Sequence, residues 1–423
     1  MQTSVFVLPR GVELGGVTTW SIQMTRHLAN LGHPVTLLKH KETDSKGNDA
    51  LIESLPVVKC PGKPAWSVKK NDLEDYLPAY RQVLPATFIP NWTFGTYATC
   101  AYLSQEESNS LRVIGLAHSD EDVYYAWLQY YEPVIHLFIA VSDEIANKLK
   151  ALFPHRVEDI VTRACAVEVP AYFDRTPNEG DSPIRLMYAG RIQNQQKRIY
   201  DLLVLIKWLI RYDVDFMLTL VGDGSEKIWL QEQVHKLLGD AAVGKVIFAG
   251  TVEPKRMPDL WRSADVGLLV SDFEGTSISM LEAMAQGCVP VVTNVSGTSA
   301  VIRHGLNGFT VPVGDMKAMA SYIKGLSDDR QMLHGVGEKA HKTVLAHYSF
   351  ASYIPWFSNL TEEVWQKSPR PWPADRPLLP DPLPIQKKST RYDRAINKMT
   401  RILWKANLMI KLYGFKALFM LAR

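Results

Sequence analysis

The sequence predicts an α/β fold with two Rossmann-like halves, each a parallel sheet covered by helices on both faces. Short apolar runs, typical of buried strands, alternate with longer helical or polar stretches, and this alternation restarts near residue 184. A polar segment rich in turn-forming residues, 170–183, separates the two series. With 423 residues, the chain is long enough for two domains with separate cores.

The individual elements follow from the same runs. In the first half, a strand at 4–8 leads through a glycine pair into a helix that ends near residue 31. Further strands are expected at 35–38, 86–89, 113–116 and 137–141, and in the second half at 184–189, 216–221, 246–248, 266–270 and 289–292. We therefore expect a first domain at 1–175 and a second domain at 183–346.

Composition excludes several classes of protein. Hydrophobic residues make up 46% and charged residues 22%, and no run of eighteen apolar residues could span a bilayer. The N-terminus lacks the basic and apolar regions of a secretion signal. The four cysteines are scattered without a C-x-x-C pair, which argues against a disulfide framework or a zinc site. These features predict a cytoplasmic protein.

Two glutamates eight positions apart, Glu274 and Glu282, lie between a predicted strand and a short helix at 278–286. Because that helix starts at the carboxyl edge of the sheet, its N-terminus suits an anionic or hydroxyl-rich ligand. Carboxylates that accept paired hydrogen bonds from neighbouring hydroxyls can hold a sugar and a ribose. The alternative is that both are ordinary solvated glutamates, as most charged residues are.

The loop before this helix contains the other residues of the candidate site. Gly275 allows a tight turn, and either Thr276 or Ser277 can cap the backbone N–H groups at the helix start, next to Ile278. We expect the backbone of Gly275 to Ser279, together with Glu274, to hold the sugar.

The segment Glu282-Ala-Met-Ala-Gln-Gly287-Cys-Val-Pro290-Val, with Glu274 before it, resembles the E-x7-E signature of glycosyltransferase family 4, the retaining GT-B enzymes. The family often has Phe-Gly after the first glutamate, whereas this chain has Gly275-Thr276. The resemblance extends from about residue 4 to residue 367. It implies the GT-B fold, in which two Rossmann-like domains face a cleft, the first binding the acceptor and the second the nucleotide sugar.

Residues of the first half also match family positions. The loop with Gly15 and Gly16 corresponds to the family's glycine pair, which approaches the donor phosphates and the acceptor. His118, in Ile114-Gly-Leu-Ala-His-Ser-Asp120, stands where the family has a histidine after a strand. From the residues alone, the glycines fit a tight turn equally well, and a single histidine is more often a packing residue.

Two cations follow the first strand of the second half. Arg191 can bind a diphosphate with its bidentate guanidinium and Lys197 as a point charge, although both could be solvated loop residues. The pair resembles the family's Gly-Arg … Lys-Gly motif, with Arg198 where glycine is usual.

Two later strand ends also match family patterns. Gly222 lies in Val221-Gly-Asp-Gly224, and Thr251 and Val252 stand where the family contacts the nucleotide base, although turn glycines explain these segments nearly as well. A further departure is Ser296-Gly-Thr-Ser-Ala300, where the family commonly has Gly-Gly-x-Pro-Glu and this chain lacks the glutamate.

The end of the chain is a separate electrostatic region. Residues 386–423 hold ten Lys or Arg and one Asp, a net charge of +9, which leaves −6 for the rest of a chain whose total is +3. A crossover helix at 347–367 and a proline-rich linker at 368–385 precede it. Cations recur at helical spacing, with Leu403 and Ile410 among the residues expected on the opposite face. We expect a basic amphipathic helix on an anionic membrane surface, or alternatively docked on the protein or on a second copy.

The resemblance implies transfer of a sugar from a nucleoside diphosphate sugar to a hydroxyl acceptor, with retention at the anomeric carbon. The acceptor is expected to be lipid-linked or a glycan, as in polysaccharide biosynthesis. Glu274, Arg191, Lys197 and His118 are the candidate catalytic residues, and Glu282 would hold the ribose. Because Arg191 and Lys197 can neutralise the diphosphate, neither a metal nor another cofactor is expected.

Two other functions fit the same architecture, a sugar-nucleotide epimerase and a non-catalytic, membrane-associated partner of another transferase. Nucleic-acid binding is disfavoured because bulky aliphatic residues interleave the cations of the tail.

Overall fold

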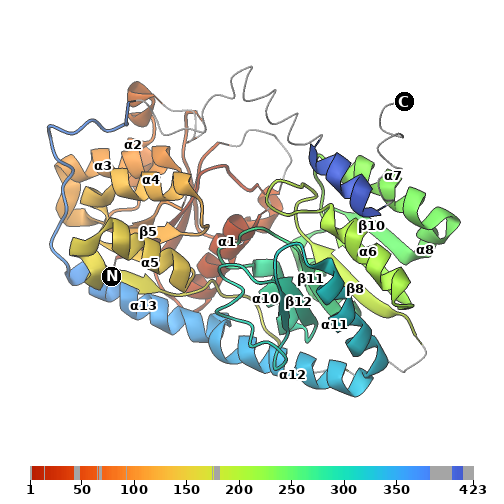
Figure 1. The fold of residues 1–423 in the computed structure, drawn as a ribbon. Helices are drawn as coiled ribbons and strands as arrows, with labels where there is room; N and C mark the ends of the chain where they lie inside the picture. The colour runs from red at the N-terminus through yellow and green to blue at the C-terminus, as the bar shows by residue number, and fades with distance from the viewer. Residues whose placement is uncertain are drawn as a thin grey trace. The chain divides into compact units, whose positions relative to one another are not determined.

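The computed structural model describes residues 2–13, 15–41, 48–63, 65, 69–91, 93–173, 175, 182–381 and 403–412. The chain forms two compact units (Figure 1). Unit 1 comprises Met1–Val167 and His347–Ile385, and unit 2 comprises Glu168–Ala346 and Gln386–Arg423. Every pairing between named strands is parallel, so the predicted α/β class with two parallel sheets is confirmed.

The sheet of unit 1 has seven strands in the order β3-β2-β1-β4-β5-β6-β7. Its central strands are long apolar runs buried on both faces, as parallel strands under two helical layers must be. Ser4 pairs with Val35, and Phe88 pairs with Val113. The strands are β1 Thr3–Leu8, β2 Val35–Lys39, β3 Val57–Lys59, β4 Ala86–Ile89, β5 Leu111–Ala117, β6 Leu137–Ala140 and β7 Ile160–Thr162.

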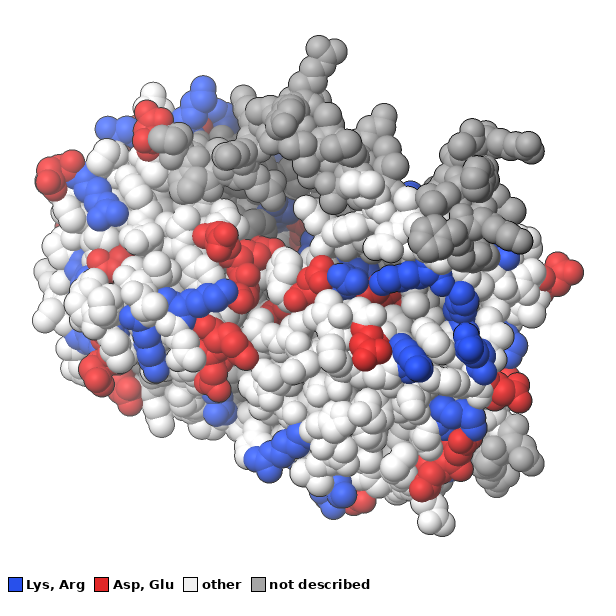
Figure 2. Space-filling model, viewed as in Figure 1, with Lys and Arg blue, Asp and Glu red and all other residues white. Residues whose placement is uncertain are grey.

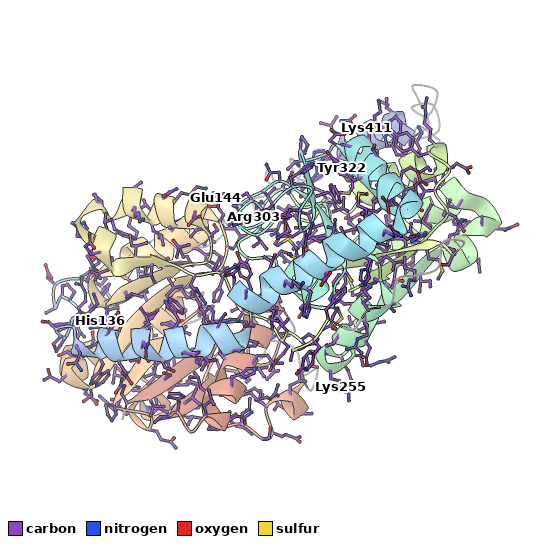
Figure 3. The ribbon with its side chains drawn as sticks, turned by 90° about the horizontal axis from the view of Figure 1, so that it is seen from below. His136, Glu144, Lys255, Arg303, Tyr322 and Lys411 are labelled. Atoms are coloured by element: carbon purple, nitrogen blue, oxygen red, sulfur yellow. The ribbon has the colours of Figure 1, made fainter. Side chains whose placement is uncertain are left out.

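The helices of unit 1 cover both faces of this sheet. They are α1 Gly16–Asn30, α2 Leu77–Arg81, α3 Phe94–Glu107, α4 Asp122–Tyr130, α5 Asp143–Leu152 and α13 Phe350–Gln366. Figure 3 shows α13 lying across one face of the sheet, where Phe357 stacks on Phe6 with ring centroids 5.6 Å apart. This helix therefore belongs to the core of unit 1, although it lies far from β1 in the sequence.

The proline-rich segment is also packed against unit 1. Residues 368–381 contain no helix, in line with their proline content. Trp372 is buried, its backbone N–H donates to Ser104 Oγ at 2.9 Å, and Tyr131 donates to the carbonyl of Leu378 at 2.9 Å. The described part of the predicted linker is thus anchored along the unit and is not a free spacer.

The sheet of unit 2 has six strands in the order β10-β9-β8-β11-β12-β13. The strands are β8 Ile184–Ala189, β9 Phe216–Val221, β10 Val246–Gly250, β11 Val266–Leu269, β12 Val289–Thr293 and β13 Phe309–Val311. The helices are α6 Asp201–Arg211, α7 Lys227–Leu238, α8 Ala242–Lys245, α9 Met257–Ser263, α10 Ile278–Ala285, α11 Met316–Asp328 and α12 Arg330–His347.

Within the tail, residues 403–412 form a helix next to α7 in unit 2 (Figure 1). Leu408 and Leu412 join the core of unit 2, and Lys207 Nζ donates to the carbonyls of Lys411 at 2.9 Å and Leu412 at 2.6 Å. Lys405 Nζ lies 4.4 Å from the centre of the Trp229 ring. This part of the tail is therefore docked on the protein, the alternative reading of the sequence.

The docked helix buries only part of its apolar surface against unit 2. Leu403, expected on the apolar face, is 61% exposed, because Leu408 and Leu412 occupy the contact with unit 2. Arg391, Arg394, Lys398 and Arg401, on which the basic pattern also rested, lie outside the described residues. None of the described helices is both long enough and apolar enough to cross a bilayer.

Candidate functional site

The candidate donor site lies at the carboxyl edge of the unit 2 sheet, between β8 and β11. These two strands are neighbours, and the chain order reverses at this point because β9 and β10 lie on the other side of β8. In open parallel sheets, ligands bind in the crevice outside such a topological switch point. The loops that leave β8 and β11 carry three of the predicted residues, Arg191, Lys197 and Glu274.

A buried ion pair joins the two loops. Lys197 Nζ lies 2.6 Å from Glu274 Oε1, and the two side chains are 15% and 8% exposed. Arg191 is exposed, and its guanidinium donates to Gln196 Oε1 at 2.7 Å. Gln196 in turn donates from Nε2 to the carbonyl of Phe273 at 3.0 Å. The structure thus connects both predicted cations with the first glutamate of the motif.

The start of α10 has the predicted cap. Ser277, rather than Thr276, accepts the backbone N–H of Met280 at 3.4 Å, so its hydroxyl occupies one free donor of the helix N-terminus. Ser277 and Gly275 are buried, whereas Thr276 and Ile278 are half-buried. The loop backbone and the first turn of α10 therefore lie together beside Glu274.

The segment that lacks the family's glutamate supports this loop instead. Ser296 Oγ donates to the carbonyl of Glu274 at 2.6 Å. Gly297 has φ +74°, and a Cβ at this position would overlap the carbonyl oxygen of Gly275. The Ser-Gly pair therefore packs directly against the backbone of the loop that holds Glu274.

Glu282 lies in α10, beyond its first turn, and is half-buried. Burial raises the pKa of its carboxyl group to about 7, and an interaction with the Trp261 side chain opposes this rise. A carboxylate in this environment gains from hydrogen-bond donors that stabilise its charge. Vicinal hydroxyls of a ribose are donors of that kind.

Close packing of strand ends explains the glycine at position 222. The backbone N–H of Gly222 donates to the carbonyl of Gly250 at 2.8 Å, and its φ of +128° is left-handed. A Cβ on Gly222 would overlap the carbonyl oxygen of Gly190, so no other residue fits without a shift. Thr251 and Val252 follow Gly250 at the same edge of the sheet. Thr251 is exposed and Val252 is half-buried.

In unit 1, the corresponding switch point lies between β1 and β4. Gly15 forms the N-terminal cap of α1 and Gly16 its first residue, and both are exposed. The carbonyl of Gly15 accepts the N–H of Thr19 at 2.9 Å, and a Cβ on Gly15 would meet nothing within 4 Å. The loop is thus open to solvent in unit 1.

His118 follows β5 and is held by Asn91, which follows β4. Asn91 Nδ2 donates to the carbonyl of Val7 at 2.5 Å, so its Oδ1 faces His118 Nε2 at 3.0 Å. Nε2 must therefore carry the ring proton, which leaves Nδ1 as an acceptor. Burial lowers the pKa of His118 to about 3, so the ring is neutral at physiological pH.

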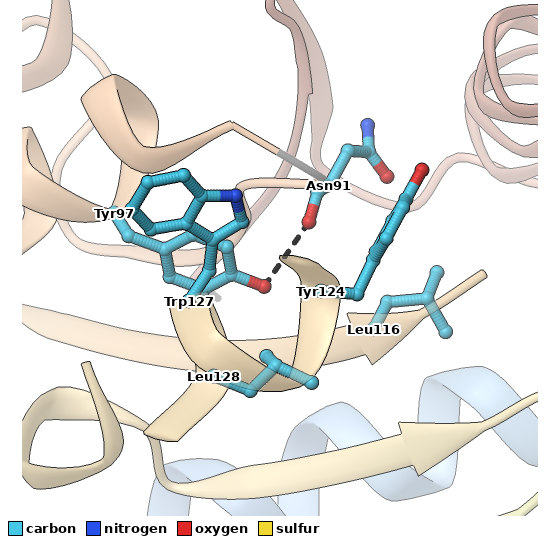
Figure 4. Close-up of a pocket in the computed structure, with 6 residues that line it drawn as sticks. All are labelled: Asn91, Tyr97, Leu116, Tyr124, Trp127 and Leu128. Carbon is cyan, nitrogen blue, oxygen red and sulfur yellow. Dashed lines mark hydrogen bonds between the residues drawn. The ribbon is translucent and has the colours of Figure 1, made fainter. Parts of the chain in front are cut away.

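A small pocket lined by aromatic and aliphatic side chains adjoins Asn91 (Figure 4). Tyr97 donates from its hydroxyl to the carbonyl of Asn91 at 3.1 Å. Asn91 has φ +59°, a conformation that asparagine tolerates better than most residues. The lining residues are Asn91, Tyr97, Leu116, Tyr124, Trp127 and Leu128.

Sequence reasoning missed the residues that hold the site together. Gln196 lies in a run of polar loop residues, and Asn91 lies in an Asn-Trp-Thr sequence, so neither gave a signal for the site. Arg198 and Ser296 did give one, because both depart from the family pattern. Their contacts required the fold.

Comparison with known proteins supports the resemblance. Residues 183–329 match the family model described as glycosyl transferases group 1. N-acetyl-alpha-D-glucosaminyl L-malate synthase of Bacillus anthracis is 24% identical over 282 residues, 63% of this chain and 72% of that protein. A phosphatidyl-myo-inositol mannosyltransferase of Mycolicibacterium smegmatis is 29% identical over 51% of this chain and 54% of its own, so the chain spans about half of that relative.

Among solved structures, Anabaena HepE in complex with UDP and glucose matches with a TM-score of 0.69 and 15% identity, over 86% of this chain and all of that one. At this identity the match establishes the fold alone. With the two parallel sheets, it shows that the chain has the GT-B fold, and the resemblance to the group 1 glycosyltransferases is confirmed for residues 183–329.

Proposed function

We propose that this protein transfers a sugar from a nucleoside diphosphate sugar to a hydroxyl acceptor, with retention at the anomeric carbon. The observation that carries the proposal is the joined set of Arg191, Lys197 and Glu274 at the switch point of unit 2. Cations on one side and a carboxylate on the other suit a ligand with a diphosphate and a sugar. Because HepE was solved with UDP and glucose, UDP sugars are the first donors to test.

The proposed chemistry depends on stabilising the leaving group. When the bond from the anomeric carbon to the diphosphate breaks, negative charge grows on the diphosphate oxygens. Arg191 and Lys197, fixed by Gln196 and Glu274, are placed to stabilise that charge without further reorganisation. Glu274 and the loop backbone would hold the sugar, Glu282 the ribose, and Thr251 with Val252 would lie beside the base.

No side chain is assigned as a nucleophile in this proposal. The acceptor hydroxyl attacks from the face that the diphosphate leaves, and a donor phosphate oxygen takes its proton. His118 is a poor base near neutral pH because burial holds its pKa near 3. Its free Nδ1 can instead accept a hydrogen bond from a substrate hydroxyl and so orient it.

We further propose that transfer needs no divalent ion, because Arg191 and Lys197 supply the positive charge that a metal supplies in other transferases. Full turnover in excess EDTA is the expected result. Loss of turnover in EDTA that Mg²⁺ restores would contradict it.

Donor binding should weaken in acid. If Glu282 accepts the ribose hydroxyls, only its ionised form binds well, and a pKa of about 7 makes that form scarce at low pH. Below pH 7, the Kd of the nucleotide sugar should rise by a factor approaching tenfold per pH unit. Calorimetric titration between pH 5.5 and 8 tests this, with Glu282→Gln as a control that binds weakly without this pH dependence. A Kd for the wild-type protein that stays constant over this range would refute the assignment.

We also propose that the tail attaches the protein to an anionic membrane surface, where a lipid-linked or glycan acceptor would be found. Several cations lie on unit 2 and at the end of the docked helix. Arg211 and Lys317 both lie over the Trp208 ring, at 5.3 and 5.4 Å from its centre, and Lys207 binds the helix end near exposed Lys411, which is labelled in Figure 3. Figure 2 shows a band of Lys and Arg side chains across this face of unit 2. Leu403 and Trp404 add exposed apolar surface.

The membrane proposal predicts sedimentation with vesicles that contain anionic lipid, but not with neutral vesicles. Truncation at residue 385 is a poor test because it removes Leu408 and Leu412 from the core of unit 2. Two better variants keep both leucines. One carries the double substitution Leu403→Ser and Trp404→Ser, and the other is a chain that ends at residue 412. Each should bind anionic vesicles less than wild type. Binding by both variants equal to wild type would rule the proposal out.

A further inference from the structure

The backbone at Arg198 has a conformation that favours glycine. Its φ is +46°, in the left-handed region, where a side chain with a Cβ is disfavoured. The motif that this segment resembles has glycine at this position, and glycine adopts the same backbone without strain. An arginine here therefore has to make contacts that offset its unfavourable backbone.

The guanidinium of Arg198 makes two ion pairs. Its Nε lies 2.7 Å from Asp201 Oδ2, and its Nη1 lies 3.0 Å from Asp272 Oδ1. Asp201 is the first residue of α6, and Asp272 lies two residues before Glu274. The side chain therefore links the start of α6 to the loop that follows β11.

Gln196, in the loop after β8, also contacts the loop after β11. Its backbone carbonyl accepts the N–H of Asp272 at 2.9 Å, and its side chain donates to the carbonyl of Phe273 at 3.0 Å. Between these links, Lys197 pairs with Glu274 at 2.6 Å. Three consecutive residues, Gln196 to Arg198, thus fasten the loop after β8 to residues 272–274.

We infer that Arg198 is a positioning residue of the donor site, which fixes Glu274 beside Lys197 by holding Asp272. This rests on the proposed function for its catalytic consequence. The bond between Arg198 and Asp272 limits how far the loop can move from the cations, so losing it should loosen Glu274 even though Lys197 remains.

The decisive variant is Arg198→Gly, because it relieves the backbone and removes only the side chain. If the backbone conformation were all that mattered, glycine would be as good or better. We expect instead that hydrogen exchange of the Asp272 amide becomes at least tenfold faster, and that kcat/KM for the nucleotide sugar falls by about tenfold or more. Arg198→Lys, which can reach one aspartate at a time, should fall between the two.

Asp213→Gly is the matched control. Asp213 also has a left-handed backbone, with φ +52°, but it lies in an exposed turn after α6. This variant should leave exchange at Asp272 and kcat/KM unchanged. In a double variant of Arg198→Gly and Asp272→Asn, exchange and kcat/KM should change no more than in the more damaging single variant. Both substitutions remove the same ion pair, between Arg198 and Asp272.

Exchange and turnover separate the two proposals. Unchanged exchange at Asp272 in Arg198→Gly, or kcat/KM equal to or above that of wild type, would overturn the positioning role. If exchange at Asp272 is faster in Arg198→Gly but the wild-type protein binds no nucleotide sugar, the ion pair between Arg198 and Asp272 holds the loop as proposed. In that case the proposed function, and not the positioning role, would be refuted.

Discussion

Replacing Lys197 with alanine should abolish most turnover and also destabilise unit 2. Lys197 and Glu274 form an ion pair that is largely excluded from solvent. Loss of the cation removes a group that stabilises the leaving diphosphate, for which a decrease in kcat of about 10²–10³ is typical. It also leaves the Glu274 carboxylate buried without its partner, which costs about 3 kcal/mol of folding free energy.

A second variant separates these two effects. In Lys197→Ala with Glu274→Ala, no unpaired charge remains, so the free energy of unfolding should recover most of its loss. Turnover should stay as low as in the single variant, because both groups act on the donor. Chemical denaturation and steady-state kinetics on the three proteins measure this. Full turnover in Lys197→Ala, or its return in the double variant, would show that the pair is structural only.

Substitution of Gly297 by alanine should disrupt the loop that carries Glu274. The added Cβ would overlap the carbonyl oxygen of Gly275, and φ of +74° adds backbone strain. Because the loop would have to shift, the loss in the free energy of unfolding should be several times the roughly 1 kcal/mol that backbone strain alone costs. Donor affinity should fall as well.

Gly305 provides the control for strain without overlap. Its φ is +75°, but a Cβ there would meet nothing within 4 Å. Gly305→Ala should therefore lose about 1 kcal/mol of stability and keep its donor affinity. Thermal unfolding and donor titration compare the two variants. Similar losses of stability and affinity in both would mean that the contact between Gly297 and Gly275 does not hold the loop.

The sequence predicted the parts of the fold that depend on local pattern. Long apolar runs such as 184–189 and 216–221 became the central strands β8 and β9 with the same bounds, because strands buried on both faces need continuous apolar residues. The helix after Glu274 was also predicted, since Ser277 supplies a cap before an apolar helix.

Three strands escaped prediction. β3, β7 and β13 have three residues each and lie at the edges of their sheets. An edge strand is covered on fewer sides, so its sequence needs no long apolar run. Their pairing depends on a neighbour that is already in place, which a local pattern does not record.

The contacts of the candidate site were beyond prediction for a similar reason. Gln196 and Phe273 are 77 positions apart, and Asn91 and Val7 are 84 apart. Nothing in either local sequence marks these partners. In the tail, helical spacing could not tell which apolar residues contact the protein. Leu408 and Leu412 do so, whereas Leu403 is exposed.

The most direct test of the account is the product formed when the protein is incubated with a nucleotide sugar and no acceptor. Without an acceptor, water can attack the donor in its place, so we predict slow release of the nucleoside diphosphate, with the freed sugar first appearing in the donor's anomeric form. Arg191→Ala and Lys197→Ala should suppress this release. An isomerised sugar still attached to its nucleotide, or no release from UDP, GDP or ADP sugars, would contradict the proposed transferase.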